Sequence, residues 1–202
     1  MIMKSKRATS DKINFAHGSR GSDTSLDRAQ REEQRLNRAR ANELAARPIL
    51  AELANAGVSL RSIASFPASP TEFAAALPIY FRHLEGDYPQ DVLATMAAVL
   101  AVSQSLPYRN TLIALFKKPP LEYSSYKYAL ASAIAVTSNP KNLFETIELA
   151  RDPSFGVNRV ALLSAIKRSR KPEIQKVIDE LKSDPDLTRE IASWKRQKSA
   201  IG

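Results

Sequence analysis

The sequence of 202 residues contains no cysteine, two histidines and six glycines. The absence of cysteine excludes disulfide bonds and thiolate metal sites, and it is typical of a reducing compartment. The longest mostly apolar run, from Val92 to Val102, is far shorter than the roughly 20 residues that a membrane-spanning helix needs. No apolar segment follows the basic N-terminus, so we do not expect a secretory signal. These absences predict a cytoplasmic protein without membrane insertion.

The motifs of common catalytic and metal sites are also missing. His17 and His83 do not have the spacing of metal ligands, and the chain has neither a glycine-rich phosphate loop nor a Gly-x-Ser-x-Gly elbow. Glu145 and Glu148 lie three residues apart without a histidine neighbour, which favours an exposed helix face. We therefore predict no cofactor, no metal ion and no enzymatic activity.

What the sequence does contain is helix-forming residues in a repeating order. Alanine and leucine dominate the 44% of apolar residues, and runs of β-branched residues are few, which predicts an all-α fold. Helical patterns meet at Asp152-Pro153 and again at Asp184-Pro185, 32 residues later. An aspartate before a proline is a typical helix start, so capping is the expected role of both acids, and of Asn139 before Pro140. A unit returning at this interval indicates stacked helical hairpins.

The repeat can be aligned residue by residue over residues 94–102, 128–136 and 160–168, with offsets of 34 and 32. We expect the large residues of this alignment to lie outside and the small ones to lie where neighbouring helices approach closely. Within the helix expected over Asp87–Ser103, Met96 and Leu100 are expected to face inward. The aligned inner-helix positions are Met96, Leu130 and Leu162, then Ala98, Ser132 and Ser164, then Leu100, Ile134 and Ile166; the helices before them align at Phe81, Leu115, Ile147 and Ile178.

The segment YALASAIAV and the later LFETIELARDPSFGVNRVALLSAIKRSRKPEIQKVIDEL resemble two adjacent HEAT repeats, in the short form found in many bacterial proteins. The Arg-Asp-Pro after the first helix and the Lys-Pro-Glu before the next are particularly similar. The resemblance covers residues 70–191 well and 40–69 loosely. It implies an α-α superhelix, a solenoid of about four helical hairpins, and most often a binding scaffold.

With this resemblance, the chain divides into three expected parts. Residues 1–24 have no sustained period and are expected to form a disordered basic tail. Residues 25–69 are expected to form N-terminal helices that cap the array, with a break or restart at Pro48 and a short helix over Ser59–Phe66. Residues 70–202 form the HEAT-like repeat domain, which begins with a capping box at Ser69-Pro70-Thr71-Glu72.

The formal charge of +9 is concentrated at the two ends of the chain. Residues 1–40 hold 10 Lys/Arg against 5 Asp/Glu, residues 41–150 hold 8 against 9, and residues 151–202 hold 12 against 7. The basic run 167–171 could meet phosphates without reading bases, or it could be a solvated turn whose cations complement a helix C-terminus. The candidate anion patch comprises Arg151, Arg159, Lys167, Arg168, Arg170, Lys171 and Lys176.

Three tyrosines near the loops 104–110 and 118–126 are candidates for contact with a protein partner: Tyr108, Tyr123 and Tyr126. Exposed tyrosines beside a stiff loop suit a protein-binding surface. Equally, these tyrosines could fix the loops onto the core with their hydroxyls in water.

The function expected from these features is non-enzymatic protein binding, as a scaffold, adaptor or regulatory protein. The alternative is nucleic-acid binding through the basic ends, in its sharpest form a HEAT-like DNA glycosylase for alkylated bases, with Trp194, Asp91 and Asp152 as its relevant residues. The two hypotheses differ in one property. A nucleic-acid binder should gather lysine and arginine on the ridge of inner helices, whereas an adaptor should show tyrosines and mixed charge there.

Overall fold

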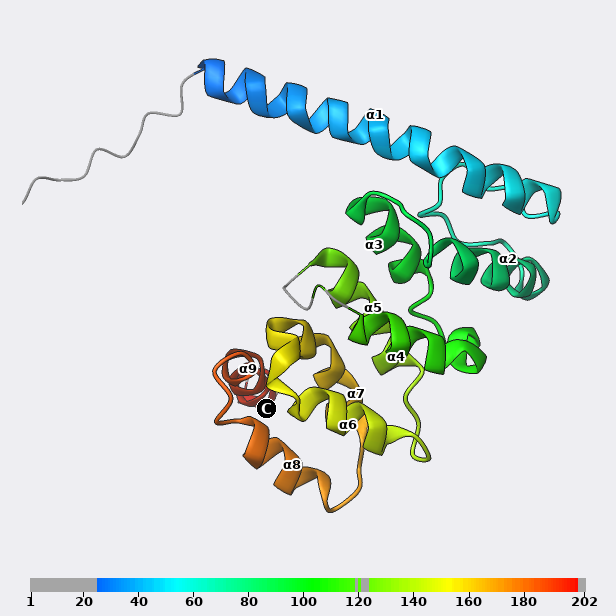
Figure 1. Cartoon of the computed structure of the whole chain (residues 1–202). Coiled ribbons are helices and arrows are strands. Elements are labelled where there is room, and N and C mark those ends of the chain that lie inside the picture. Colours follow the sequence, from blue (N-terminus) through cyan, green and yellow to red (C-terminus); the bar gives the residue numbers. More distant parts are fainter. Residues whose placement is uncertain (1–24, 119, 121–123, 200–202) are drawn as a thin grey trace, which may run out of the picture. The chain divides into compact units, whose positions relative to one another are not determined.

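The structure is a computed structural model that describes residues 25–118, 120 and 124–199, with side chains from Asp27 to Trp194. The expected tail 1–24 lies outside the described residues. Within them every regular element is a helix and no strand occurs, which confirms the all-α class. The chain divides into two units after Arg38. The helices are α1 (Ser25–Asn55), α2 (Pro70–His83), α3 (Gln90–Val99), η1 (Ser103–Tyr108), α4 (Arg109–Lys117), α5 (Ser125–Val136), α6 (Leu143–Arg151), η2 (Pro153–Leu162), α7 (Leu163–Arg168), α8 (Ile174–Leu181) and α9 (Thr188–Ser199) (Figure 1).

Helix α1 passes through Pro48 without a break, so the predicted interruption there is wrong. Proline removes the hydrogen bond to the carbonyl four residues earlier, here that of Leu44. The Leu44 side chain is 56% exposed, so water can reach this side of the helix and satisfy the carbonyl. Just after the proline, Ile49 and Leu53 are fully buried, and their burial holds the last turns of the helix in place.

The short helix predicted over Ser59–Phe66 does not form; this segment consists of bends and turns. Two side-chain hydrogen bonds replace the helical ones, one local and one from Tyr80 of α2. The Ser62 hydroxyl accepts from the Ala64 amide at 3.1 Å, and the Tyr80 hydroxyl donates to the Ile63 carbonyl at 3.2 Å. Serine side chains that bond nearby amides compete with helix formation. The start of α2 agrees with its prediction, because Ser69 accepts from the Glu72 amide at 3.1 Å and Pro70 occupies the first turn.

Some of the helices predicted to be equivalent pack against one another. Helix α3 packs against α5, α5 packs against η2 and α7, and α6 packs against α8 (Figure 1). The expectation that the large residues of the inner alignment lie outside is wrong, because all six are fully buried: Met96, Leu100, Leu130, Ile134, Leu162 and Ile166. For Met96 and Leu100 the burial agrees with their predicted inward orientation.

The small residues of the same alignment do not lie between helices, and this expectation is wrong. Ala98 and Ser164 are exposed, and Ser132 is partly exposed. Four of the alanines that do line the core lie one residue from this register: Ala97, Ala131, Ala133 and Ala165. Adjacent residues of a helix point about 100° apart, so one position separates the core from the exposed face.

The third inner helix is divided in two. Gly156 has a φ of +51°, in the left-handed region that favours glycine, and it lies within η2 before α7 begins. The kink directs the Gly156 carbonyl toward the Arg159 side chain, whose Nε donates to it at 2.9 Å. The bend and the buried arginine therefore belong to one local arrangement.

Two buried cations that lie 32 positions apart, Lys127 and Arg159, bind the carbonyl ends of α4 and α6. Lys127 Nζ donates to the carbonyls of Leu115 and Phe116 at 2.8 Å each and also to that of Lys118. Arg159 Nη1 donates to the Ala150 carbonyl at 3.1 Å. The last carbonyls of a helix have few backbone partners, so the two cations supply hydrogen bonds to groups at these helix ends. The Leu115 carbonyl also accepts from the Lys118 amide at 3.3 Å.

Arg109 makes a similar connection between α4 and the turn from α5 to α6. Its Nη1 donates to the Ile134 carbonyl at 2.7 Å, and its Nη2 donates to the Thr146 hydroxyl at 2.7 Å. Its Nε donates to Glu145 at 3.2 Å. The arginine is only 4% exposed, so these bonds fix the connection between the second and third helical pairs.

Arg159 also joins the third pair to the fourth. Its guanidinium donates to both carboxylate oxygens of Asp184, at 2.7 and 3.0 Å, and to Asp186 at 3.1 Å. The arginine is 1% exposed. Asp184 also accepts from the Asp186 amide at 3.0 Å, so its predicted local bond exists, but its main partner is the buried arginine. Asp152 has the predicted capping role and accepts from the Ser154 amide at 3.0 Å.

We predict that Arg159→Met lowers the free energy of unfolding by about 3–5 kcal/mol, because it leaves two carboxylates and a helix end without their buried partner. The control is Arg151→Met. Arg151 pairs with Glu148 and Glu180 at the surface, with 36% of its side chain exposed, and its loss should cost at most about 1 kcal/mol. Urea unfolding of both variants measures the difference. Equal losses would contradict the structural role of Arg159.

Candidate functional site

The predicted anion patch is only partly a surface. Arg159 is buried in its ion pair and is removed from the patch, since it is 1% exposed. Arg151 is engaged by two glutamates, with nitrogen–oxygen distances of 2.9 and 2.7 Å. Lys176 is exposed on α8. The remaining members, Lys167, Arg168, Arg170 and Lys171, gather at the turn between α7 and α8.

A hollow of about 530 Å³ opens on one side of this turn; we call it the basic hollow. Four cations line it: Lys167 at the end of α7, Arg170 and Lys171 in the turn, and Lys182 just after α8. Its lining also includes four apolar side chains, Ile174, Ile178, Ile191 and Trp194, and no aspartate or glutamate. Lys182 was not among the predicted residues, because it lies 11 positions from the basic run and only the turn of α8 brings it near.

Trp194 fixes one wall of the basic hollow. It is 9% exposed, and its indole Nε1 donates to Glu190 at 2.8 Å. Lys167 Nζ lies 5.1 Å from the centre of the indole ring, at cation–π distance. The wall is therefore aromatic, and one of its cations is positioned over the ring.

A second hollow of about 500 Å³ lies next to the same turn, and Arg168, Arg170 and Lys171 contribute to its lining. Arg168 Nη2 donates to the Ala135 carbonyl at 2.7 Å. Lys167 and Arg168 also lie in the last turn of α7, where cations complement the helix dipole. Part of the basic run thus has the capping role of the alternative interpretation, while Arg170 and Lys171 face both hollows.

The predicted tyrosines belong largely to the core. Tyr126 is 8% exposed, its hydroxyl donates to the Leu84 carbonyl at 3.4 Å, and burial raises the pKa of Tyr126 to about 12. The ring of Tyr108 is partly buried and stacks on Phe81 with 4.3 Å between ring centres. Tyr126 is therefore not available to a partner, and Tyr108 exposes only part of its ring. Tyr123 lies outside the described residues.

The exposed side of the inner helices presents a different surface, which we call the inner-helix face. It is formed by Ala98 of α3, by Tyr128, Ser132 and Val136 of α5, and by Ser164 and Arg168 of α7. Tyr128 is 41% and Val136 is 38% exposed. The only lysine of α3 and α5 is Lys127, which is buried, so neither of these two helices exposes a cation. Sequence reasoning missed Tyr128 because it placed the aromatic contacts in the loops.

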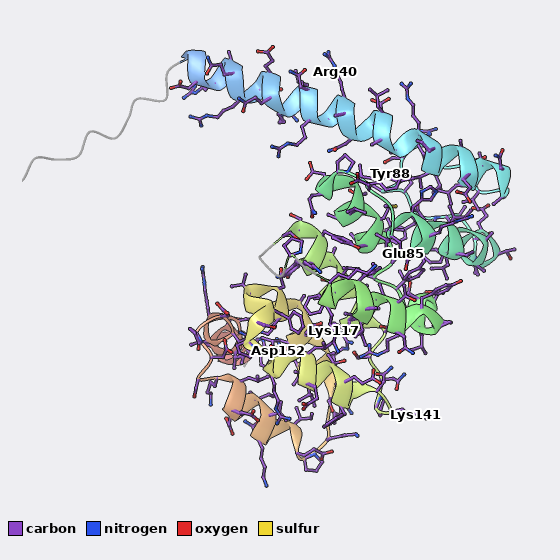
Figure 2. The ribbon with its side chains drawn as sticks, viewed as in Figure 1. Arg40, Glu85, Tyr88, Lys117, Lys141 and Asp152 are labelled. Carbon is purple, nitrogen blue, oxygen red and sulfur yellow. The ribbon has the colours of Figure 1, made fainter. Side chains whose placement is uncertain are left out.

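A third hollow, of about 890 Å³, lies between α4 and α6. Phe144 lines it and is 69% exposed, one position out of register with the buried Leu143 and Ile147. Lys117 and Asp152 lie side by side at its edge, where α4 and α6 end (Figure 2). Hydrogen bonds from Ser154 hold the pKa of Asp152 below its ordinary value. The mixed charge at this edge favours no single class of ligand.

A glutamate, a histidine and a tyrosine form a chain of hydrogen bonds that was not predicted. Glu52 lies 2.8 Å from His83 Nε2, and the Tyr88 hydroxyl lies 2.7 Å from His83 Nδ1. This chain connects the end of α1 to the end of α2. Asp91, a candidate acid of the glycosylase hypothesis, accepts a hydrogen bond from the Asn42 side chain at 3.0 Å. Among the described residues no group of three or more histidines and acids could hold a metal ion.

None of the helices in the described part combines the length and the hydrophobicity needed to cross a bilayer. Comparisons with protein-family models, curated proteins and solved structures found no match to this chain.

The ion pair between Asp184 and Arg159 predicts how stability depends on pH. Hydrogen bonding from Arg159 lowers the pKa of Asp184 below its ordinary value of 3.8. The stabilisation is therefore fully present above pH 3.8 and is lost as the pH falls through the lower pKa of the folded state. We expect Asp184→Asn to flatten the fall in unfolding free energy between about pH 5 and pH 2.

Urea unfolding at several pH values measures this slope. The control is Asp179→Asn, which removes a carboxylate paired with Lys182 at the surface and should keep the wild-type slope. A wild-type slope in Asp184→Asn would show that other carboxylates dominate acid unfolding.

Proposed function

We propose that the chain is a non-enzymatic protein-binding scaffold built from HEAT-like helical pairs, and that its partner docks on the inner-helix face. The repeated helix pattern and the neighbouring positions of α3, α5 and α7 support the solenoid arrangement. The observation that carries the functional proposal is the chemistry of the exposed face of these helices.

The centre of the inner-helix face is small, weakly apolar and almost uncharged. Tyr128 and Val136 expose about two fifths of their surface there, between the small residues Ala98 and Ser164. The cores of protein–protein interfaces are depleted of charge and enriched in tyrosine, and small neighbours allow a partner to approach closely. The face therefore has the composition that a protein partner requires.

The same face is poorly suited to nucleic acid. Affinity for nucleic acid depends on lysines and arginines that neutralise phosphates. Helices α3 and α5 expose no such residue, and Arg168, at the edge of the face, donates to the Ala135 carbonyl. The alternative hypothesis of a nucleic-acid-binding inner ridge, and of base excision on it, is therefore less well supported than protein binding.

We predict that Tyr128→Ala/Val136→Ala lowers the affinity for the partner at least about 10-fold, because it removes the largest exposed side chains of the proposed contact. Both replacements favour helix and should preserve the fold. The control is Phe66→Ala, which removes an aromatic residue that is 59% exposed elsewhere in the chain.

The measurement is affinity capture with the full chain from a nuclease-treated extract, followed by calorimetry with the captured protein and each variant. Capture that ends with nuclease treatment would contradict the proposal. If the partner binds Tyr128→Ala/Val136→Ala with wild-type affinity but does not bind Phe144→Ser, the contact lies at the hollow between α4 and α6 instead.

A further inference from the structure

We propose that the basic hollow binds an acidic, amphipathic segment of a protein partner. Carboxylates of this segment pair with Lys167, Arg170, Lys171 and Lys182, and one of its apolar side chains enters the hollow against Ile178 and Trp194. The inference rests on the proposed protein-binding function and specifies the chemistry that the partner presents.

Charge complementarity is the first support. The four cations come from the end of α7, the following turn and the residue after α8, and they converge on one hollow without an acidic residue in its lining. Lys182 pairs with Asp179 at 2.9 Å, but both side chains are about half exposed. Such surface pairs contribute little, so an incoming carboxylate can replace Asp179.

The apolar lining is the second support. Ile174 and Ile191 are buried beneath the hollow, Ile178 is partly exposed, and Trp194 forms an aromatic wall. The volume of about 530 Å³ lies within the range of ligand-binding clefts. It accommodates a side chain such as leucine or phenylalanine together with the backbone that carries it.

These two features together distinguish a protein segment from nucleic acid. A phosphate backbone would engage the cations but would leave the partly exposed side chain of Ile178 in contact with water. An acidic segment with an apolar side chain uses the charges and also buries the apolar lining. No exposed cation of α3 or α5 extends the positive surface into a track for a longer polyanion.

The test uses the full chain and three probes of equal charge, followed by fluorescence anisotropy. The first is a helical 12-residue peptide with glutamates and two leucines at i and i+4. In the second both leucines are replaced by glutamine. The third is a single-stranded DNA oligonucleotide. We expect the first to bind at least about 10-fold more tightly than the others. It should also shift the emission of Trp194, the only tryptophan of the chain. Equal binding of all three probes would overturn the inference.

The variant K167Q/R170Q/K171Q/K182Q should weaken binding of the first peptide by about 10- to 100-fold. Its matched control is R28Q/R31Q/R35Q/R38Q, which removes the same four charges from the fully exposed part of α1 and should change binding less than about 3-fold. Equal losses in both variants would show attraction by net charge alone and overturn the site. Ile178→Gln should remove the preference for the leucine-bearing peptide while leaving the second peptide unaffected.

The outcomes separate this inference from the proposed function. If the peptide does not bind but Tyr128→Ala/Val136→Ala still loses affinity for the captured partner, the proposed site in the basic hollow is wrong and the proposed contact at the inner-helix face is supported. If the peptide binds in the basic hollow but the double variant binds the partner with wild-type affinity, the proposed contact at the inner-helix face is wrong and the proposed site in the hollow is supported.

Discussion

The buried guanidinium of Arg159 is the interaction on which the C-terminal half of the structure depends. Burying a cation costs several kcal/mol unless it is paired and its hydrogen bonds are satisfied. Arg159 meets this requirement with the carboxylates of Asp184 and Asp186 and with the carbonyls of Ala150 and Gly156. The end of α6, the bend at Gly156 and the turn before α9 must therefore adopt their positions together. This dependence sets the place of α8 and α9, and with it the shape of the basic hollow.

The position of Arg159 in the repeat explains why a charge is tolerated there. The equivalent residues, 32 to 34 positions apart, are Leu93, Lys127, Arg159 and Ile191, and all four are buried. In the two middle pairs this position faces the carbonyl end of the preceding outer helix, and a cation satisfies those carbonyls. Lys127 is only 5% exposed, and this burial lowers its pKa to about 8. The first and fourth pairs carry a hydrophobic residue at the same place.

This pattern also shows what could be predicted from the sequence. Composition and helical periodicity identified the all-α class and the buried positions Met96 and Leu100, because apolar residues at helical spacing mark the buried side of a helix. They could not identify a buried Arg159, whose burial depends on Asp184, 25 residues later in the chain. Alignment likewise showed that Ala98 and Ser164 are equivalent, but equivalence does not specify which side of a helix faces the solvent. The short helix predicted over Ser59–Phe66 does not form, because hydrogen bonds to side chains replace the backbone hydrogen bonds of a helix.

The distribution of charge divides the surface into two regions with different capacities. Structural pairing removes Arg159 and Lys127 from the cations available to a ligand. The inner-helix face is consequently almost uncharged, whereas the turn after α7 concentrates its cations around an apolar hollow. An uncharged tyrosine-bearing face provides contact area, and a charged rim accelerates association and selects partners of opposite charge. A partner with both an apolar contact surface and an acidic segment would bind both regions. The two regions differ in charge because the fold buries Lys127 and Arg159 and leaves the cations of the turn after α7 at the surface.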